Sequence, residues 1–244
     1  MTTSRFLLGF VILYGVLAGL AELDATGRIG IVILAAVLPA AIAVERFLGH
    51  LRPEVALRKL GLGRPDPQAV IVAAVVSALI LGVYPLVTQL TGAVITLKPG
   101  WPWLLVGIFA FHGLAEELVW RGYAFRRLRS RHSFGVAVLA TMPLVAATHV
   151  PVLFRSGLVV GVAAVLVAAV TSLPLAYLFE TGRQTIWAPA IVHTAIDSFK
   201  LVNVPTDASL IFSLTFTAVS LTVPLLALGA RPATPSARIT QEES

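Results

Sequence analysis

Cysteine is absent from this sequence of 244 residues, and charged residues are scarce, at 12% of the chain. The lack of cysteine excludes a disulfide framework, a thiol nucleophile and a zinc finger. Because soluble domains carry about 25% charged residues, the low charge argues against a water-soluble globule and against a disordered chain. Hydrophobic residues make up 57% of the sequence, and the mean hydropathy is +0.90. The composition therefore predicts a membrane protein.

Long windows without charge indicate where the chain crosses the bilayer. A transmembrane helix needs about 20 apolar residues. We predict an all-α polytopic membrane protein with about eight spans, near residues 6–22, 29–45, 69–90, 103–128, 136–154, 158–179, 186–202 and 209–229. Only Arg5 precedes the first span, which makes a weak signal-peptide start, so a retained first helix is favoured over a cleaved signal peptide, and loop charge does not decide between them. The fourth and seventh spans reach a full crossing only if they include charged residues.

The positive charge of the chain, +6 at neutral pH, is unevenly distributed. With the N-terminus in the cytoplasm, thirteen Lys and Arg residues fall in cytoplasmic segments and four on the opposite side. Since positive residues favour the cytoplasmic side, we predict that both termini are cytoplasmic. The same distribution accounts for the charge without a nucleic-acid partner. We expect an integral protein of the plasma membrane of a prokaryote, in contact with the lipid bilayer.

The predicted organisation has four parts. Residues 1–102 form an N-terminal three-helix region, in which the basic, amphipathic segment 45–68 lies on the membrane surface. Residues 103–202 form a catalytic core from the fourth to the seventh helix. Residues 203–229 hold the last transmembrane helix, and residues 230–244, rich in Pro, Ser, Thr and Ala, form a disordered tail.

The middle of the fourth span carries three charged residues, Glu116, Glu117 and Arg121. An ionisable side chain in mid-bilayer costs at least about 2.5–3.5 kcal/mol and therefore indicates a function. Glu117 and Arg121 are four residues apart on one helix face, which predicts a structural ion pair. Glu116 points about 100° away from Glu117 and has no basic partner within its own turn. Two adjacent carboxyl groups make one of them a candidate general acid or base.

Two further spans bring histidine and aspartate into the bilayer. His193 and Asp197 lie one turn apart on the seventh span, where a carboxylate can fix the tautomer of an imidazole. His149 lies near the end of the fifth span, about 24 Å from Ser133. It reaches the depth of the other groups only if residues 133–139 run along the surface or Pro143 breaks the helix. We predict that these groups converge with Glu116 on one water-containing pocket.

These residues resemble the signature of the CAAX-protease and bacteriocin-processing (CPBP) family of intramembrane endopeptidases, which includes the Rce1-like prenyl-protein proteases. The family pattern Glu-Glu-x-x-x-Arg corresponds to residues 116–121, Phe-x-x-x-His to Val145 and His149, and His-x-x-x-Asn/Asp to His193 and Asp197. The resemblance covers about residues 103–202. Val145 replaces the usual Phe. Asp197 stands where prenyl-protein proteases have Asn, and an ionised carboxylate cannot donate a hydrogen bond to an oxyanion.

The resemblance implies a membrane-embedded endopeptidase similar to CAAX prenyl protease 2, with a peptide or protein substrate that is lipid-modified or membrane-associated. Glu116 and His149 would activate a water, while His193 and Asp197 would stabilise the oxyanion. Glu117 and Arg121 would hold the fourth helix in register. The distances of Glu116 and His193 along their helices, about 15 Å and about 12 Å from the cytoplasmic ends, favour substrate entry from the cytoplasm or from the lipid.

Several alternatives stay open at this point. The favoured mechanism uses no cofactor, but Glu116, His149 and His193 are also suitable zinc ligands, and His112 could be a further ligand or a bystander. Inward-facing Glu, His and Asp side chains also mark proton-coupled transporters, although the sequence has no internal repeat. An inactive family member could act as an immunity or binding protein. A serine protease is disfavoured because no G-x-S-x-G motif is present.

Overall fold

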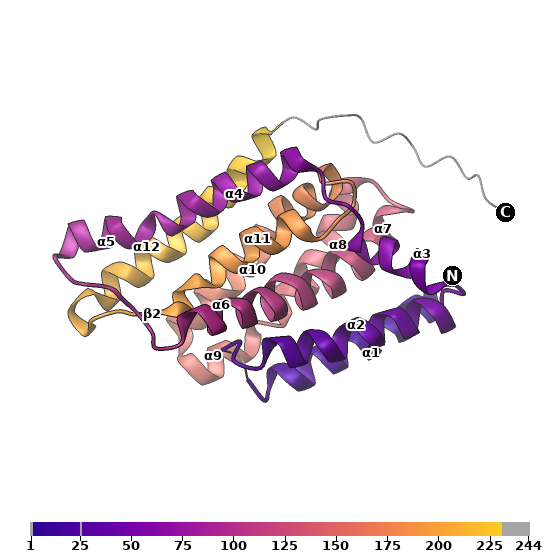
Figure 1. Ribbon diagram of the computed structural model, residues 1–244, viewed down its shortest axis with the longest axis horizontal. Coiled ribbons are helices and arrows are strands. Elements are labelled where there is room, and N and C mark those ends of the chain that lie inside the picture. Colours follow the sequence, from indigo (N-terminus) through magenta and orange to yellow (C-terminus); the bar gives the residue numbers. More distant parts are fainter. Residues whose placement is uncertain (1, 25, 231–244) are drawn as a thin grey trace.

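The computed structural model of the protein describes residues 2–24 and 26–230. These residues form an elongated bundle of helices with one short pair of antiparallel strands (Figure 1). The predicted disordered tail, 230–244, lies outside the described residues except for Ala230.

Within the described part of the chain, seven helical rods are long and apolar enough to cross a membrane. The first three rods are α1 (Thr3–Ala21), α2 (Gly30–Phe47) and α4 with α5 (Pro67–Leu81 and Val83–Thr91). The next three are the fourth rod (Trp101–Arg129), α8 with α9 (Phe134–Ala147 and Val150–Ser156) and α10 (Leu158–Thr181). In the last rod, η5 (Thr206–Ala208) precedes α12 (Ser209–Thr222) and η6 (Val223–Gly229). Each rod coincides with a predicted span. The prediction of an all-α polytopic membrane protein is confirmed.

The remaining predicted span, 186–202, is shorter than the others. It consists of α11 (Trp187–Ile196), followed by a 3₁₀ turn, η4 (Asp197–Leu201), and the strand β2 (Val202–Asn203). In Figure 1, α11 runs through the interior of the bundle, and it packs against α4, α10 and the fourth rod. A helix that is covered by neighbours on most sides can be apolar over most of its surface.

The fourth rod departs from a regular α-helix. It begins as α6 (Trp101–Ile108), continues through two π-helical segments, η2 (Phe109–Ala115) and η3 (Leu118–Phe125), and ends as α7 (Arg126–Arg129). Glu116 and Glu117 lie between the two π-helical segments. Such wider turns often occur at functional sites because they redirect side chains.

Glycine allows the N-terminal helices to lie close to the fourth rod. A Cβ atom built on Gly30 would lie 1.9 Å from the backbone oxygen of Gly107. The same test at Gly107 gives 1.9 Å to the oxygen of Gly27. No other residue fits at these contacts without a shift of the backbone. The two positions therefore fix the contact between α2 and the fourth rod.

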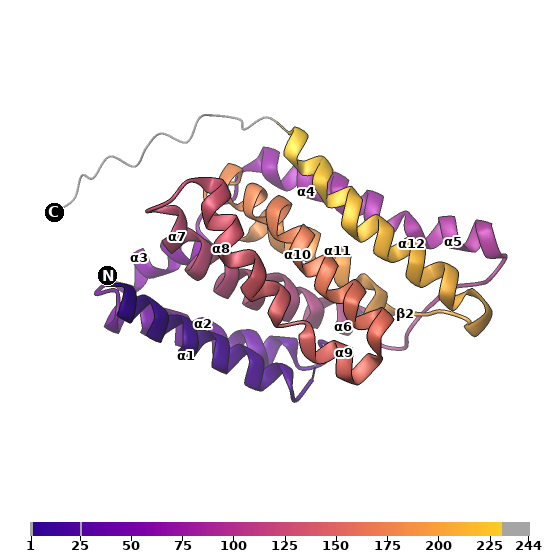
Figure 2. The same ribbon diagram turned by 180° about the vertical axis from the view of Figure 1, so that it is seen from behind.

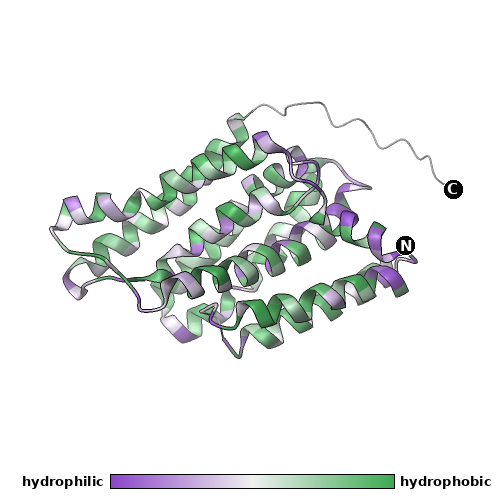
Figure 3. Ribbon diagram, viewed as in Figure 1, coloured by the Kyte–Doolittle hydropathy of each residue, from purple (hydrophilic) through white to green (hydrophobic). Residues whose placement is uncertain are grey.

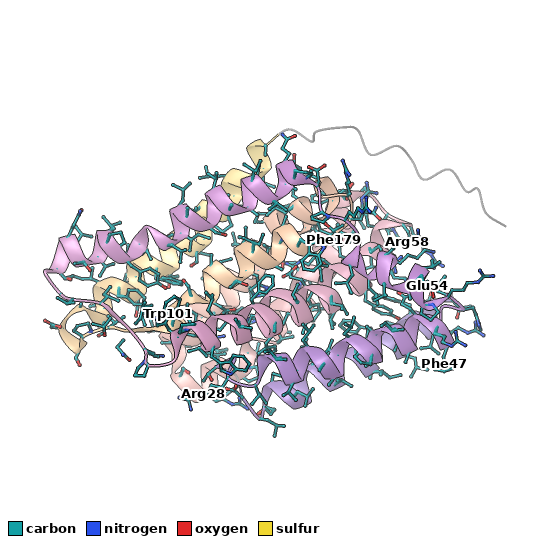
Figure 4. All side chains as sticks on the ribbon, viewed as in Figure 1. Arg28, Phe47, Glu54, Arg58, Trp101 and Phe179 are labelled. Atoms are coloured by element: carbon teal, nitrogen blue, oxygen red, sulfur yellow. The ribbon has the colours of Figure 1, made fainter. Side chains whose placement is uncertain are left out.

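Hydrophilic residues gather at the two ends of the bundle, and hydrophobic residues dominate its middle (Figure 3). One end carries the N-terminus, α7 and the short helix α3 (Pro53–Leu57), which continues into the π-helical turn η1 (Arg58–Leu62) (Figure 1). The other end carries the strand pair of β1 (Thr96–Leu97) and β2. Figure 4 shows Arg58 and Glu54 at the first end and Trp101 toward the second. Leu60 of η1 is fully buried, so the predicted amphipathic segment directs apolar side chains into the bundle.

From the sequence, His149 was expected to reach the other groups only if residues 133–139 run along the surface or if Pro143 breaks the helix. The fifth rod of the structure tests both conditions. α8 begins at Phe134 and continues without a break through Pro143 to Ala147. The rod bends only at residues 148–149, before α9, which lies at the foot of the bundle in Figure 2. Neither a surface segment at 133–139 nor a break at Pro143 is present.

Candidate active site

Side chains from the fourth rod and from α11 meet inside the bundle. A Cβ atom on Gly113 would lie 2.7 Å from the Thr194 hydroxyl and 3.1 Å from the Ala190 carbonyl, so glycine lets α11 approach closely just before the acidic pair. Nε2 of His193 consequently lies 3.8 Å from Oε2 of Glu116. The predicted convergence of the fourth and seventh spans is present in the structure.

Glu117 is fully buried and binds two partners through one oxygen. Its Oε1 accepts a hydrogen bond from Nη1 of Arg121 at 2.8 Å, and it lies 2.7 Å from Nδ1 of His193. An ionised carboxylate has no proton to donate, so Nδ1 of His193 carries the hydrogen. The predicted ion pair is present, and it also orients the imidazole of the neighbouring helix. Sequence reasoning assigned this orienting role to Asp197, whose Oδ2 is 3.6 Å from Nε2 of His193.

Glu116 has a partner that the sequence analysis did not assign to it. Nδ1 of His112, one turn earlier on the same rod, lies 2.7 Å from Oε1 of Glu116. The expectation that Glu116 lacks a basic partner is therefore wrong. The reason is that His112 is neutral in a count of formal charges, although four-residue spacing places it on the same face.

Lys200 is the residue that sequence reasoning missed. Its Nζ atom lies 2.9 Å from Oδ1 of Asp197 and 2.7 Å from Nε2 of His112. The side chain is 18% exposed. Spacing alone could have identified it, because Lys200 follows Asp197 by three residues on a helical turn. It was instead counted among the four basic residues on the side opposite the cytoplasm, although it lies within the predicted span 186–202.

His149 is not joined to this cluster by any contact among the described residues. Its Nδ1 lies 3.1 Å from the carbonyl oxygen of Val145 and 3.1 Å from the hydroxyl of Thr148, both in its own rod. Val145, which replaces the Phe of the family pattern, is buried with Trp120 and Ala168. The catalytic role of His149 remains a prediction.

The charges of the cluster nearly balance. Its carboxyl groups belong to Glu116, Glu117 and Asp197, and its permanent cations to Arg121 and Lys200. A single proton on one of the histidines or carboxyl groups would bring the cluster to neutrality. Since isolated charge is costly away from water, the site is expected to hold such a proton, which is what acid–base chemistry requires.

The described residues do not fit a metal centre. No group of three His, Asp or Glu side chains among them is arranged to hold an ion. The zinc set proposed from the sequence needs His149, whose described contacts are to Val145 and Thr148.

An apolar cavity of about 300 Å³ lies next to the strand pair. It is lined by Tyr84 and Leu81 of the third rod, by β1 and by Ser198 and Leu201 of η4. The Tyr84 hydroxyl lies 2.7 Å from the Ser198 hydroxyl. The cavity thus lies directly beside Asp197 and Lys200 in the chain.

The fold and the cluster define a polytopic, all-α membrane protein with a buried acid–histidine site. Residues 98–199 match the model of the Rce1-like family, described as type II CAAX prenyl endopeptidase Rce1-like. The match includes all six site residues predicted from the sequence, and it supports the resemblance to the CPBP family. The matched family model describes endopeptidases of the CAAX-protease type. Comparison with curated proteins finds no matching relative.

Proposed function

We propose that this protein is an intramembrane endopeptidase in which Glu116 activates the attacking water. The observation that supports this most directly is the distance of 3.8 Å between Oε2 of Glu116 and Nε2 of His193. This distance is too long for a direct hydrogen bond and suits two groups bridged by one water. Both side chains are only 15% exposed, so bulk water is largely excluded from the site.

In the proposed reaction, Glu116 takes a proton from the bridging water while the water oxygen attacks the scissile carbonyl carbon. The carbonyl oxygen becomes an oxyanion, and protonated Nε2 of His193 donates a hydrogen bond to it. One such donor contributes about 3–4 kcal/mol in other hydrolases. Collapse of the intermediate breaks the C–N bond, and Glu116 returns its proton to the leaving amine.

Glu117 and Asp197 support His193 from opposite nitrogens. Glu117 accepts from Nδ1 and so directs Nε2 toward the substrate. Asp197 cannot itself donate to the oxyanion while ionised. Its carboxylate, 3.6 Å from Nε2, instead favours positive charge on the ring, which is needed when the oxyanion forms.

We retain His149 as the predicted second group that binds the attacking water. Its described side-chain contacts are to Val145 and Thr148 of its own rod, so the role rests on the family pattern. The His149→Ala variant tests the role. A fall in kcat of about 100-fold or more would support it, since general acid–base groups contribute that much or more. A variant with wild-type kcat would remove His149 from the mechanism.

We further propose that the substrate is a lipid-modified or membrane-associated peptide or protein, and that both termini face the cytoplasm. The family supports a peptide substrate in a membrane. The thirteen-to-four distribution of basic residues supports the orientation. The described chain also begins and ends at the same end of the bundle (Figure 1). We keep the plasma membrane of a prokaryote as the proposed location.

The decisive experiment compares wild type with Glu116→Gln in liposomes that contain a fluorogenic membrane peptide. Glutamine keeps the size of the side chain but cannot accept the proton of water, so cleavage should disappear while unfolding and reconstitution stay unchanged. Full cleavage by Glu116→Gln would end the proposal. Proton flux measured in the same vesicles distinguishes a transporter, and a folded wild type without cleavage of any membrane peptide would favour the inactive, binding role.

The proposed mechanism needs no metal. Elemental analysis of the purified protein, combined with chelator treatment, tests this point. Stoichiometric zinc that is lost together with activity, and that restores activity when added back, would replace the metal-free mechanism by the zinc alternative.

A further inference from the structure

Lys200 contacts both halves of the candidate site. We propose that Lys200 is a positioning residue that supplies the counter-charge of Asp197 and holds the acid–histidine cluster in its reactive arrangement. The catalytic part of this inference rests on the proposed endopeptidase function, whereas the coupling between Lys200 and Asp197 can be measured without it.

The first half of the argument is electrostatic. Asp197 is 13% exposed, and Nζ of Lys200 lies 2.9 Å from its Oδ1. The other basic groups near Asp197 are His112 and His193, each with a ring nitrogen 3.6 Å from Oδ2. Lys200 is thus the one permanent cation in described contact with this carboxylate. Removing one partner of an enclosed ion pair is costly because the other charge stays behind.

The second half concerns hydrogen-bond direction. An ammonium group donates and cannot accept, so Nε2 of His112 must be the acceptor of the contact with Lys200 at 2.7 Å. Nδ1 of His112 then carries the hydrogen and donates to Oε1 of Glu116. The other carboxylate oxygen of Glu116 is left to face His193. Lys200 therefore contacts Asp197 directly and orients Glu116 through His112.

The backbone of Lys200 is itself fixed. Nζ of Lys98 donates to the carbonyl oxygen of Lys200 at 2.8 Å, and the amide of Lys98 donates to the carbonyl oxygen of Leu201 at 2.8 Å. These contacts continue into the pairing of β1 with β2. The position of the ammonium group is thus set by the strand pair at this end of the bundle.

Lys200 is needed as a counter-charge only while residue 197 carries a carboxylate. Lys200→Met should lower kcat by about tenfold or more and leave KM within about twofold, since it disturbs the reacting groups and not the outer substrate contacts. In the Asp197→Asn background the same change should be much milder, within about threefold of Asp197→Asn alone. Lys200→Arg, which keeps the charge, should retain most of the activity. Lys59→Met, at the opposite end of the bundle, is the matched control and should behave as wild type.

The coupling is also measured by equilibrium unfolding of the wild type, Lys200→Met, Asp197→Asn and the double variant. Lys200→Met should be the least stable, and Asp197→Asn should restore stability to it. If Lys200→Met does not fold but the double variant does, the inference is supported. Additive effects of the two changes, or a folded Lys200→Met with wild-type kcat, overturn it. Failure of the proposed function appears separately, as retained cleavage by Glu116→Gln or absence of cleavage by the wild type.

Discussion

Replacing Glu117 by Gln tests how much the central ion pair contributes to the fold. The carboxylate is fully buried, and Arg121 is 3% exposed, so the guanidinium cannot reach water when its partner loses charge. Breaking an enclosed ion pair from one side costs about 3–5 kcal/mol. Glutamine keeps an oxygen that can accept both bonds made by Oε1, at 2.8 Å from Arg121 and 2.7 Å from His193, but it removes the negative charge. We therefore expect a loss of about 3 kcal/mol for Glu117→Gln and about 5 kcal/mol for Glu117→Ala.

The measurement is reversible unfolding in mixed micelles with a rising fraction of denaturing detergent. The matched control is Glu22→Gln. Glu22 pairs with Arg155, and both side chains are 57% exposed, so this pair should contribute less than about 1 kcal/mol. If Glu117→Gln were as stable as Glu22→Gln, the account of Glu117 as a buried, charged anchor would be wrong. On the folded fraction, Glu117→Gln should also lower kcat, because the partner of the His193 Nδ1–H loses its negative charge and no longer favours positive charge on the ring.

Three further variants test the packing and the electrostatics elsewhere in the bundle. Gly107→Ala should lose about 1–3 kcal/mol or more in the same unfolding assay because its Cβ meets a backbone oxygen at 1.9 Å, whereas Gly15→Ala, with nothing within 4 Å, should be neutral or stabilising. Glu45→Ala should lose about 3–5 kcal/mol, since the fully buried carboxylate pairs with two arginines of α7. Partial burial raises the pKa of Asp24, but hydrogen bonds from the Thr26 hydroxyl and from backbone amides lower it below its ordinary value. Asp24 therefore stabilises the fold above its unfolded pKa, and the stability difference between wild type and Asp24→Asn should shrink as the pH falls below about 4.

Each of these has an outcome that contradicts it. Equal stability of Gly107→Ala and Gly15→Ala would mean that the helices adjust to the added methyl group. A neutral Glu45→Ala would mean that the arginines find water. A stability difference for Asp24→Asn that stays constant with pH would show that the hydrogen bonds of the loop do not depend on the charge of the carboxylate.

The helices and their approximate ends followed from the sequence because apolar length is a local property. Every rod of the structure lies on a predicted span, and the short α11 was already marked by its dependence on Asp197. The fourth and seventh spans were also identified from local sequence as the spans that carry the site, because each must place charged residues in the bilayer. The Glu117–Arg121 pair followed from helical spacing.

Contacts between helices were harder to predict from the sequence, because they depend on the rotation and depth of each helix relative to its neighbours. The bond from His193 to Glu117 needs the close approach at Gly113, which no spacing rule contains. Lys200 was counted with the charges outside the bilayer because a count of charge does not show that a 3₁₀ turn brings its side chain back toward Asp197.

The sequence alone thus determined an all-α membrane protein and the charged positions that the bilayer makes expensive, because hydrophobic burial acts on each segment separately. Only the tertiary structure decided which of those groups share hydrogen bonds. It joined His112 and Lys200 to the acids, and it left His149 within its own rod because α8 continues past Pro143. A hydrogen bond requires two atoms within about 3 Å, and for residues far apart in the chain that distance is set by the packing of whole helices.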